Sequence, residues 1–319
     1  MKKSLLALAV LGAFAGAASA QSSVTLYGRV DLSVAKNAGS AQKAMQNGSG
    51  SRFGVRGVED LGGGTSAFFN IEHRYNADTG AMSDAARMWG GRSIVGLQGG
   101  FGKVTLGREY TTAFLGSQLV ADPWGWDTVA TDLTVALTGG AIARVRNDSS
   151  LTYNFAASGF SFGAQTAEAV DTINNFQKKP VNFSLGYAAG PLAIGMGYER
   201  TGQGAAASAK WTTFHGSYNL GAVRLGGLIG TGNTAANTKL KSWMLTAVAP
   251  MGQGEFRAAF GKLTADPAGA APKTDAAKGF AVGYHYALSK RTTLYTEFVR
   301  NTARVTEKTG YDFGIKHNF

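Results

Sequence analysis

Residues 181–198 read VNFSLGYAAGPLAIGMGY, and this stretch decides between the folds that the sequence allows. Its two halves alternate with a period of two residues on either side of the turn residues Ala188–Pro191, which is typical of a β-hairpin. One face of the hairpin is apolar: Phe183, Leu185, Tyr187, Leu192, Ile194, Met196 and Tyr198. The other face is small or polar: Asn182, Ser184, Gly186, Ala193, Gly195, Gly197 and Glu199.

The small, polar face has too little bulk to be part of a packed core. A soluble β-sandwich fills its interior at high density with large side chains from both sheets. The polar face is therefore expected to meet water, and the apolar face to meet lipid. A large soluble sandwich built from ordinary amphipathic strands is the alternative to this interpretation.

The same alternation recurs along the chain and predicts an all-β fold. Val24–Val34 alternates in the same way, and its second face carries Arg29 and Asp31. Short Gly-rich turns alternate with longer polar connections, as in outer-membrane barrels. We therefore predict a transmembrane antiparallel β-barrel of about 16 strands, a size that leaves an aqueous lumen.

The first residues and the composition limit the class of protein. Lys2 and Lys3 precede an apolar stretch and the small-residue site Ala18–Ala20, which predicts an export signal over residues 1–20 and a barrel domain over 21–319. Without these two lysines the net charge of +11 becomes +9, and no basic cluster supports nucleic-acid binding. The chain has no cysteine, and beyond the signal it has no apolar run long enough for a membrane helix.

The longest break in the alternation is Tyr110–Arg146. Connections of this length inside a compact domain are uncommon and usually functional. The break contains the aromatic turn DPWGW at 122–126, the carboxylates Asp122, Asp127 and Asp132, and the terminal pair Arg144 and Arg146.

Six segments together resemble the trimeric general porins of the Gram-negative outer membrane, in the form common among beta-proteobacteria. They are SVTLYG at 23–28, SRFG at 51–54, GVEDLGGG at 57–64, GKVTLGR at 102–108, LSKRTTLY at 288–295 and GIKHNF at 314–319. The resemblance implies that the third long loop, here residues 110–146, folds into the lumen and forms a constriction. It also implies that loop carboxylates, Asp122 and Asp127 first and Asp132 after them, face arginines on the opposite wall.

The resemblance has consequences for assembly as well. Phe319, with Ile315, Phe313 and Tyr311, is similar to the family's signal for the barrel-assembly machinery. A homo-oligomer, expected to be a trimer, placed in the outer membrane among its lipid and lipopolysaccharide is implied in the same way. His317 stands where many such proteins have tyrosine.

The wall arginines follow from the alternation alone, because a charge facing lipid near the midplane costs about 2–4 kcal/mol. The positions on the polar face are Arg29, Arg52, Arg56, Arg74, Arg92 and Arg146, of which about half are expected at the mouths as solvated charges. Strict alternation would point Arg108 at lipid. A bulge would reset the register there, and the resemblance favours a pore-lining Arg108.

These residues predict a water-filled pore for passive diffusion of small hydrophilic solutes and ions. Rings of Arg favour anions, and inward arginines outnumber inward acids, so an anion preference is expected. A solute-selective channel and a barrel enzyme or adhesin are the alternatives. The four histidines, which lie on separate strands without metal-ligand spacing, are His73, His215, His285 and His317. No enzyme activity, cofactor or metal is therefore expected.

Overall fold

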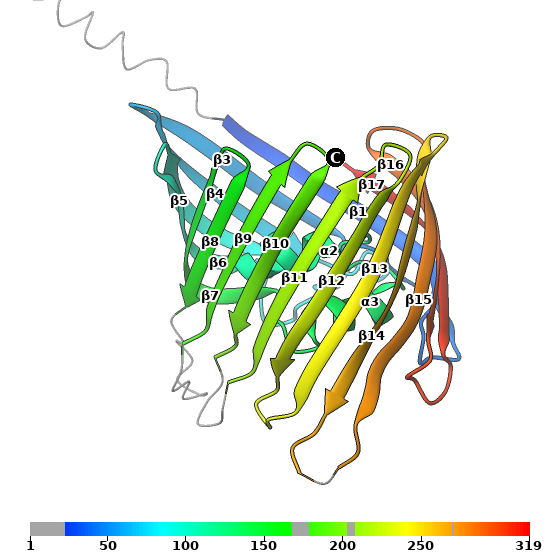
Figure 1. Cartoon of the computed structure of the whole chain (residues 1–319). Helices are drawn as coiled ribbons and strands as arrows, with labels where there is room; N and C mark the ends of the chain where they lie inside the picture. Colours follow the sequence, from blue (N-terminus) through cyan, green and yellow to red (C-terminus); the bar gives the residue numbers. More distant parts are fainter. Residues whose placement is uncertain (1–22, 168–178, 203–207, 270) are drawn as a thin grey trace, which may run out of the picture.

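The computed structural model describes residues 23–167, 179–202, 208–269 and 271–319, and its strands form one closed antiparallel ring (Figure 1). The expected signal over residues 1–20 lies outside the described residues. The first nine strands in the ring are β1 (Ser23–Lys36), β2 (Lys43–Asn47), β3 (Arg52–Gly62), β4 (Thr65–Arg74), β5 (Arg92–Gly99), β6 (Gly102–Tyr110), β7 (Arg146–Ala157), β8 (Phe160–Ala167) and β9 (Val181–Ala189). The others are β10 (Leu192–Arg200), β11 (Lys210–Asn219), β12 (Arg224–Asn233), β13 (Lys239–Met251), β14 (Gly254–Asp266), β15 (Thr274–Ala287), β16 (Thr292–Asn301) and β17 (Thr309–Asn318).

The barrel has 16 wall positions, as predicted, because β2 and β3 share one of them. Both pair with β1: β2 along residues 32–36 and β3 along residues 23–29. Residues 48–51 interrupt the shared strand. Between Lys36 and Arg52, five residues therefore extend the wall as β2.

The ring closes between the two ends of the described chain. β1 pairs with β17 from Arg29↔Asn318 to Lys36↔Tyr311. Beyond that ladder, Gly28 and Phe319 exchange two backbone hydrogen bonds of 3.0 and 3.1 Å. A Cβ on Gly28 would lie 2.3 Å from the Phe319 ring, so the terminal ring packs directly on this glycine. Closure leaves no unpaired strand edge in the membrane.

The two ends of the barrel differ, and one connection fills its interior. Short turns lie at the end where the C-terminus is found, and long connections lie at the other end (Figure 1). Between β6 and β7 the chain forms η1 (Phe114–Gln118), α2 (Leu119–Ala121) and α3 (Thr131–Gly139), and the two α-helices lie inside the ring. No helix of the described part of the chain is both long and apolar enough to cross a membrane.

The alternation of the strands separates an outer from an inner face. On β1, Leu26 and Val34 are 63% and 54% exposed, whereas the intervening Asp31 and Ser33 are buried. Large exposed hydrophobic side chains occur on the same outer face of strand after strand. A water-soluble fold would bury this surface, whereas lipid covers it in a membrane barrel.

Candidate functional site: the pore constriction

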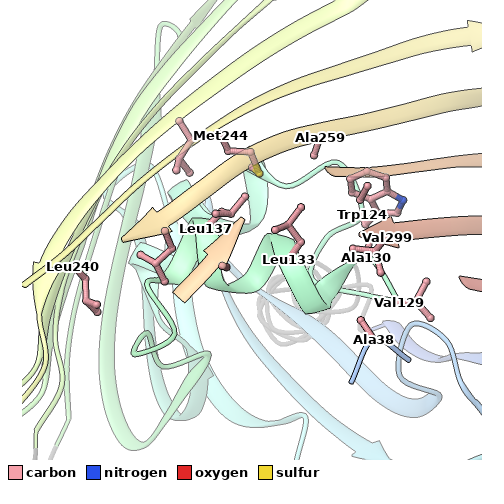
Figure 2. Close-up of a cluster of buried hydrophobic side chains, with 14 of the residues drawn as sticks. Ala38, Trp124, Val129, Ala130, Leu133, Leu137, Leu240, Met244, Ala259 and Val299 are labelled. Atoms are coloured by element: carbon pink, nitrogen blue, oxygen red, sulfur yellow. The ribbon is translucent and has the colours of Figure 1, made fainter. Parts of the chain in front are cut away.

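The connection between β6 and β7 is held inside the barrel by an apolar helix face. Leu133 and Leu137 of α3 are fully buried against the inner side of the wall formed by β12–β16 (Figure 2). Their wall partners include Met244, Leu263 and Val299. These wall residues lie on the inward face of their strands, so this sector of the lumen is filled by protein rather than water.

The end of α3 is capped by wall side chains. The Thr138 carbonyl accepts hydrogen bonds from Trp211 Nε1 at 2.8 Å and Thr213 Oγ1 at 3.2 Å. Ser242 Oγ donates to the Leu137 carbonyl at 2.6 Å. The last carbonyls of a helix have no partner within the helix, so these donors fix its C-terminus to β11 and β13.

The wall carboxylates of β10, β16 and β17 bind loop backbone or loop side chains. Glu199 accepts from the Arg144 amide at 2.6 Å. Glu297 accepts from the Thr128 hydroxyl, from the Ala130 amide at 3.4 Å and from His285 Nε2 at 2.9 Å. Asp312 accepts from the Val129 amide at 3.4 Å. These acids therefore hold the loop in place and are covered by it.

Asp122 shapes the turn of the loop instead of facing the wall arginines. Its buried carboxylate accepts from the amides of Trp124 at 3.0 Å and Trp126 at 2.9 Å, and from Thr134 Oγ1 at 3.0 Å. With three donors inside the loop, it is not brought to the arginines. The turn that it organises holds Trp126 and Thr128 at φ of 62° and 71°, left-handed conformations that a non-glycine residue adopts only when its surroundings impose them.

Asp127 lies between Trp126 and Thr128 in the chain, and it is the loop carboxylate that approaches the arginines of the barrel wall. Its Oδ2 lies 3.7 Å from Arg29 Nη1, and its side chain is 30% exposed. Burial raises the pKa of the Asp127 carboxyl to about 6, against the lowering effect of Arg52, Arg29 and Arg74. The carboxylate therefore sits opposite several guanidinium groups and titrates close to neutral pH.

The interruption between β2 and β3 positions two of these arginines. Arg52 donates to the carbonyls of Ser49 at 2.7 Å and Gly50 at 3.0 Å, and Arg29 Nη1 donates to Ser49 Oγ at 2.8 Å. Asp31 lies behind them, fully buried, and accepts from the Ser49 amide at 2.9 Å and Tyr295 OH at 2.6 Å. The break in the strand thus turns carbonyls toward the arginines while the nearby carboxylate is covered.

Tyr110 gathers three further arginines. Its hydroxyl accepts from Arg74 Nη2 at 2.6 Å and from Arg146 Nη2. Its ring lies under the guanidinium groups of Arg146 and Arg92, at 4.0 and 4.8 Å from the ring centroid, as in cation–π contacts. Two carboxylates form ion pairs with these arginines: Glu72 with Arg74 at 2.7 Å and Glu109 with Arg92 at 2.8 Å.

Three predicted site residues, Arg56, Arg108 and Asp132, lie away from the arginines that surround Tyr110 and Asp127. Arg56 lies toward the short turns, its guanidinium 5.2 Å from the Tyr27 ring centroid. The expected bulge is present between Gly107 and Glu109, but Arg108 pairs in register with Ser93 on the outward face and contacts Asp148 at 2.5 Å. Asp132, in the first turn of α3, forms an ion pair with Arg304.

Two features of the site have no counterpart among the sequence predictions, Tyr110 and the 48–51 break. Tyr110 enters the sequence interpretation only as a boundary, although its place at the end of a strand beside inward arginines is a usable signal. Gly48–Ser51 has the composition of an ordinary loop, and nothing in it marks an interrupted strand. Among the described residues no group of three or more His, Asp or Glu is arranged to hold a metal ion.

The closed barrel, its internal loop and the arginine group define a membrane pore narrowed from within. The sequence pattern of the Gram-negative porin family matches residues 7–306, and the chain belongs to this family. It is 33% identical to outer membrane porin protein 32 of Delftia acidovorans, with both chains covered completely.

Solved structures agree with this assignment. An anion-selective porin from Comamonas acidovorans is 27% identical, with a TM-score of 0.77 over 94% of this chain and 100% of that one. The trimer form of OmpT from Vibrio cholerae, 16% identical, gives a TM-score of 0.72 over 93% and 99% of the two chains and supports the fold alone. The protein is therefore an outer-membrane porin that forms a water-filled channel.

Proposed function

We propose that the channel is a general diffusion pore for small hydrophilic solutes that prefers anions. The observation that carries this is the excess of positive charge at the constriction. Five guanidinium groups gather there, whereas three carboxylates lie beside them: Glu72, Glu109 and Asp127. The guanidinium groups belong to Arg29, Arg52, Arg74, Arg92 and Arg146.

The loop is the source of this imbalance. The loop binds Glu199, Glu297 and Asp312 and so covers these wall carboxylates from the water. Its own partly exposed carboxylate is that of Asp127. Asp127 opposite the arginines creates a field across the pore. Between low-dielectric walls each charge acts more strongly than in bulk water. The net positive lining then favours anions.

A swelling assay tests the general-diffusion part. Liposomes containing the purified protein should swell in isotonic solutions of unrelated neutral sugars and zwitterionic amino acids, at rates that fall smoothly with solute size. Swelling confined to one chemical class would instead indicate a solute-selective channel. The proposal includes no catalytic step.

The assembly expectations are part of the same proposal. The outward residues at the end of the chain are Tyr311, Phe313 and Ile315 of β17 and, after the strand, Phe319, the set expected to engage the barrel-assembly machinery. We propose a homotrimer, supported by family membership and by the apolar outer face of β1 along residues 24–34, where Leu26 and Val34 are exposed. Lipopolysaccharide is the expected lipid partner of the outer leaflet.

A further inference from the structure

A row of basic side chains and a row of aromatic side chains run side by side across four neighbouring strands. On each of β13–β16, a basic residue lies two positions from an aromatic residue, always on the side of the long connections. The pairs are Lys241 with Trp243, Lys262 with Phe260, Lys278 with Phe280, and Arg300 with Phe298. We call these eight residues the outer strip.

The strip faces outward because the chain neighbours of its members face inward. Ser242, Leu263, Ala281 and Val299 are buried on the lumen side, where Leu263, Ala281 and Val299 belong to the cluster around α3. Successive residues of a strand point to opposite faces. In agreement, Phe260 is 50% exposed although the lumen side of the same wall is filled.

Strand pairing joins the two middle members of each row. Lys262 lies directly opposite Lys278, and Phe260 lies directly opposite Phe280. The outer members lie diagonally, because Trp243 is opposite Lys262 and Phe280 is opposite Arg300. The Trp243 and Phe260 rings are 5.3 Å apart between centroids, and those of Phe280 and Phe298 are 5.9 Å apart. With neighbouring strands about 4.8 Å apart, the four cations span roughly 14 Å.

Carboxylates neutralise only part of the positive charge of the basic row. Asp275 contacts Lys262 at 2.7 Å and Lys278 at 3.7 Å, so one carboxylate serves two lysines. No carboxylate of the described residues lies within ion-pair distance of Lys241 or Arg300. Four cations against one acid, set beside an apolar lipid-facing surface, suit an anionic group held at the membrane interface.

The opposite end of the same strands carries no such row. There the outward strand residues are uncharged, and they include Phe256, Tyr284 and Tyr286. Outer-membrane barrels place their short turns in the periplasm and their long loops outside. The basic row therefore lies at the level of the outer leaflet headgroups, and the aromatic row lies just below it, at the border of the acyl chains.

We propose that the outer strip is a binding site for lipopolysaccharide, with the phosphates of its lipid headgroup on the four cations and its sugar–acyl border against the four rings. A headgroup with two separated phosphates can engage a row of this width, whereas a single phosphate reaches only one or two of the cations. The inference rests on the outer-membrane placement of the chain and not on its ion preference.

The test titrates purified folded protein in detergent with bisphosphorylated lipid A and follows the temperature at which the folded form unfolds on a gel. The variant carries Lys241→Gln, Lys262→Gln, Lys278→Gln and Arg300→Gln. The matched control carries Lys273→Gln, Lys290→Gln, Lys308→Gln and Arg291→Gln, three lysines and one arginine outside the strip. Lysine and arginine each contribute measurably to headgroup binding, so the strip variant should need at least about tenfold more lipid A for half-saturation.

Three further measurements complete the design. The control should bind like the wild type, and dephosphorylated lipid A and phosphatidylglycerol should protect the wild type only weakly. Single-channel conductance of the strip variant should equal that of the wild type, which shows that it folds and separates this inference from the proposed pore function. The double variant Lys241→Gln with Arg300→Gln serves if the fourfold variant does not fold.

Equal protection of strip variant and wild type would overturn the proposal. So would equal weakening of the control, because the effect would then be overall charge. Equal protection of the wild type by phosphatidylglycerol or by dephosphorylated lipid A would also overturn it, since the site would then not recognise a bisphosphorylated headgroup.

Discussion

At the scale of single residues, the charge of the pore lining depends on the direction in which each ionisable side chain points. An arginine on a strand has only two directions to point, and near the midplane the cost of facing lipid selects the inward one. Near the long connections the cost is small, and there Arg108 and Arg300 point outward. Asp122 and Asp127 lie in the same loop, where no alternation pattern predicts the direction of a side chain. Their directions differ because they make different hydrogen bonds. Asp122 has three donors within the loop, whereas Asp127 follows a strained residue and faces Arg29.

The raised pKa of Asp127 leads to a pH dependence of selectivity. With a pKa of about 6, the carboxyl is mostly ionised at pH 7.5 and mostly neutral at pH 5. Its loss of charge increases the positive excess at the constriction, so anion preference should rise as pH falls through this range. A unit charge about 5 Å from a passing ion contributes roughly 0.8 kcal/mol in water before screening by salt, so we expect about a threefold change in the anion-to-cation permeability ratio.

The Asp127→Asn variant supplies the comparison for this prediction. Zero-current potentials in a KCl gradient at pH 7.5 should match those of the wild type at pH 5. Between the two pH values the variant should change little. A variant that kept the full pH dependence of the wild type would show that another group is responsible.

At the scale of elements, the internal loop is understood from the wall on which it packs. On β13, Trp243, Met244 and Leu245 are consecutive apolar residues, which breaks the expected alternation. The inward member, Met244, packs near Leu137 of α3 (Figure 2). Apolar residues at inward positions of β12–β16 are therefore a signal for where the loop docks, but the sequence alone does not say which segment covers them.

Leu137→Ala should loosen the loop while leaving the barrel intact. A buried leucine truncated to alanine typically costs about 2–5 kcal/mol, and here the loss falls on the contact between α3 and the wall. Single-channel recordings should show a larger and more variable conductance, and the loop should become sensitive to added protease. Leu220→Ala, at an exposed turn position, is the matched control and should behave as the wild type. A steady wild-type conductance in Leu137→Ala would show that this contact does not hold the loop.

At the scale of the whole molecule, the barrel could be predicted because its strands repeat one pattern from end to end. The even number of positions and the alternation of short and long connections followed from counting. The sequence did not predict that β2 and β3 share one wall position. This arrangement depends on residues 48–51 folding toward Asp31 and the arginines.

Closure of the ring predicts that the terminal residue matters for assembly. Phe319 forms two backbone hydrogen bonds with Gly28, and its ring covers that glycine. Deletion of Phe319 should lower the amount of folded protein in the outer membrane severalfold, whereas Phe319→Tyr, which keeps the ring, should have little effect. Quantitative gels of heat-modifiable protein in outer-membrane fractions measure both. Normal levels of the deleted form would mean that these contacts are dispensable.

The most direct test of an anion-preferring constriction is the zero-current potential across a planar bilayer with a KCl gradient. The wild type should show the sign of anion preference. Arg29→Gln, Arg52→Gln and Arg74→Gln together should move the potential toward cation preference, and the shift should shrink at high salt because exposed charges are screened within about 8 Å at physiological ionic strength. The mouth control Lys273→Gln, Lys290→Gln and Lys308→Gln should leave the potential almost unchanged. An equal shift in this control, or none in the arginine variant, would contradict the assignment of the constriction.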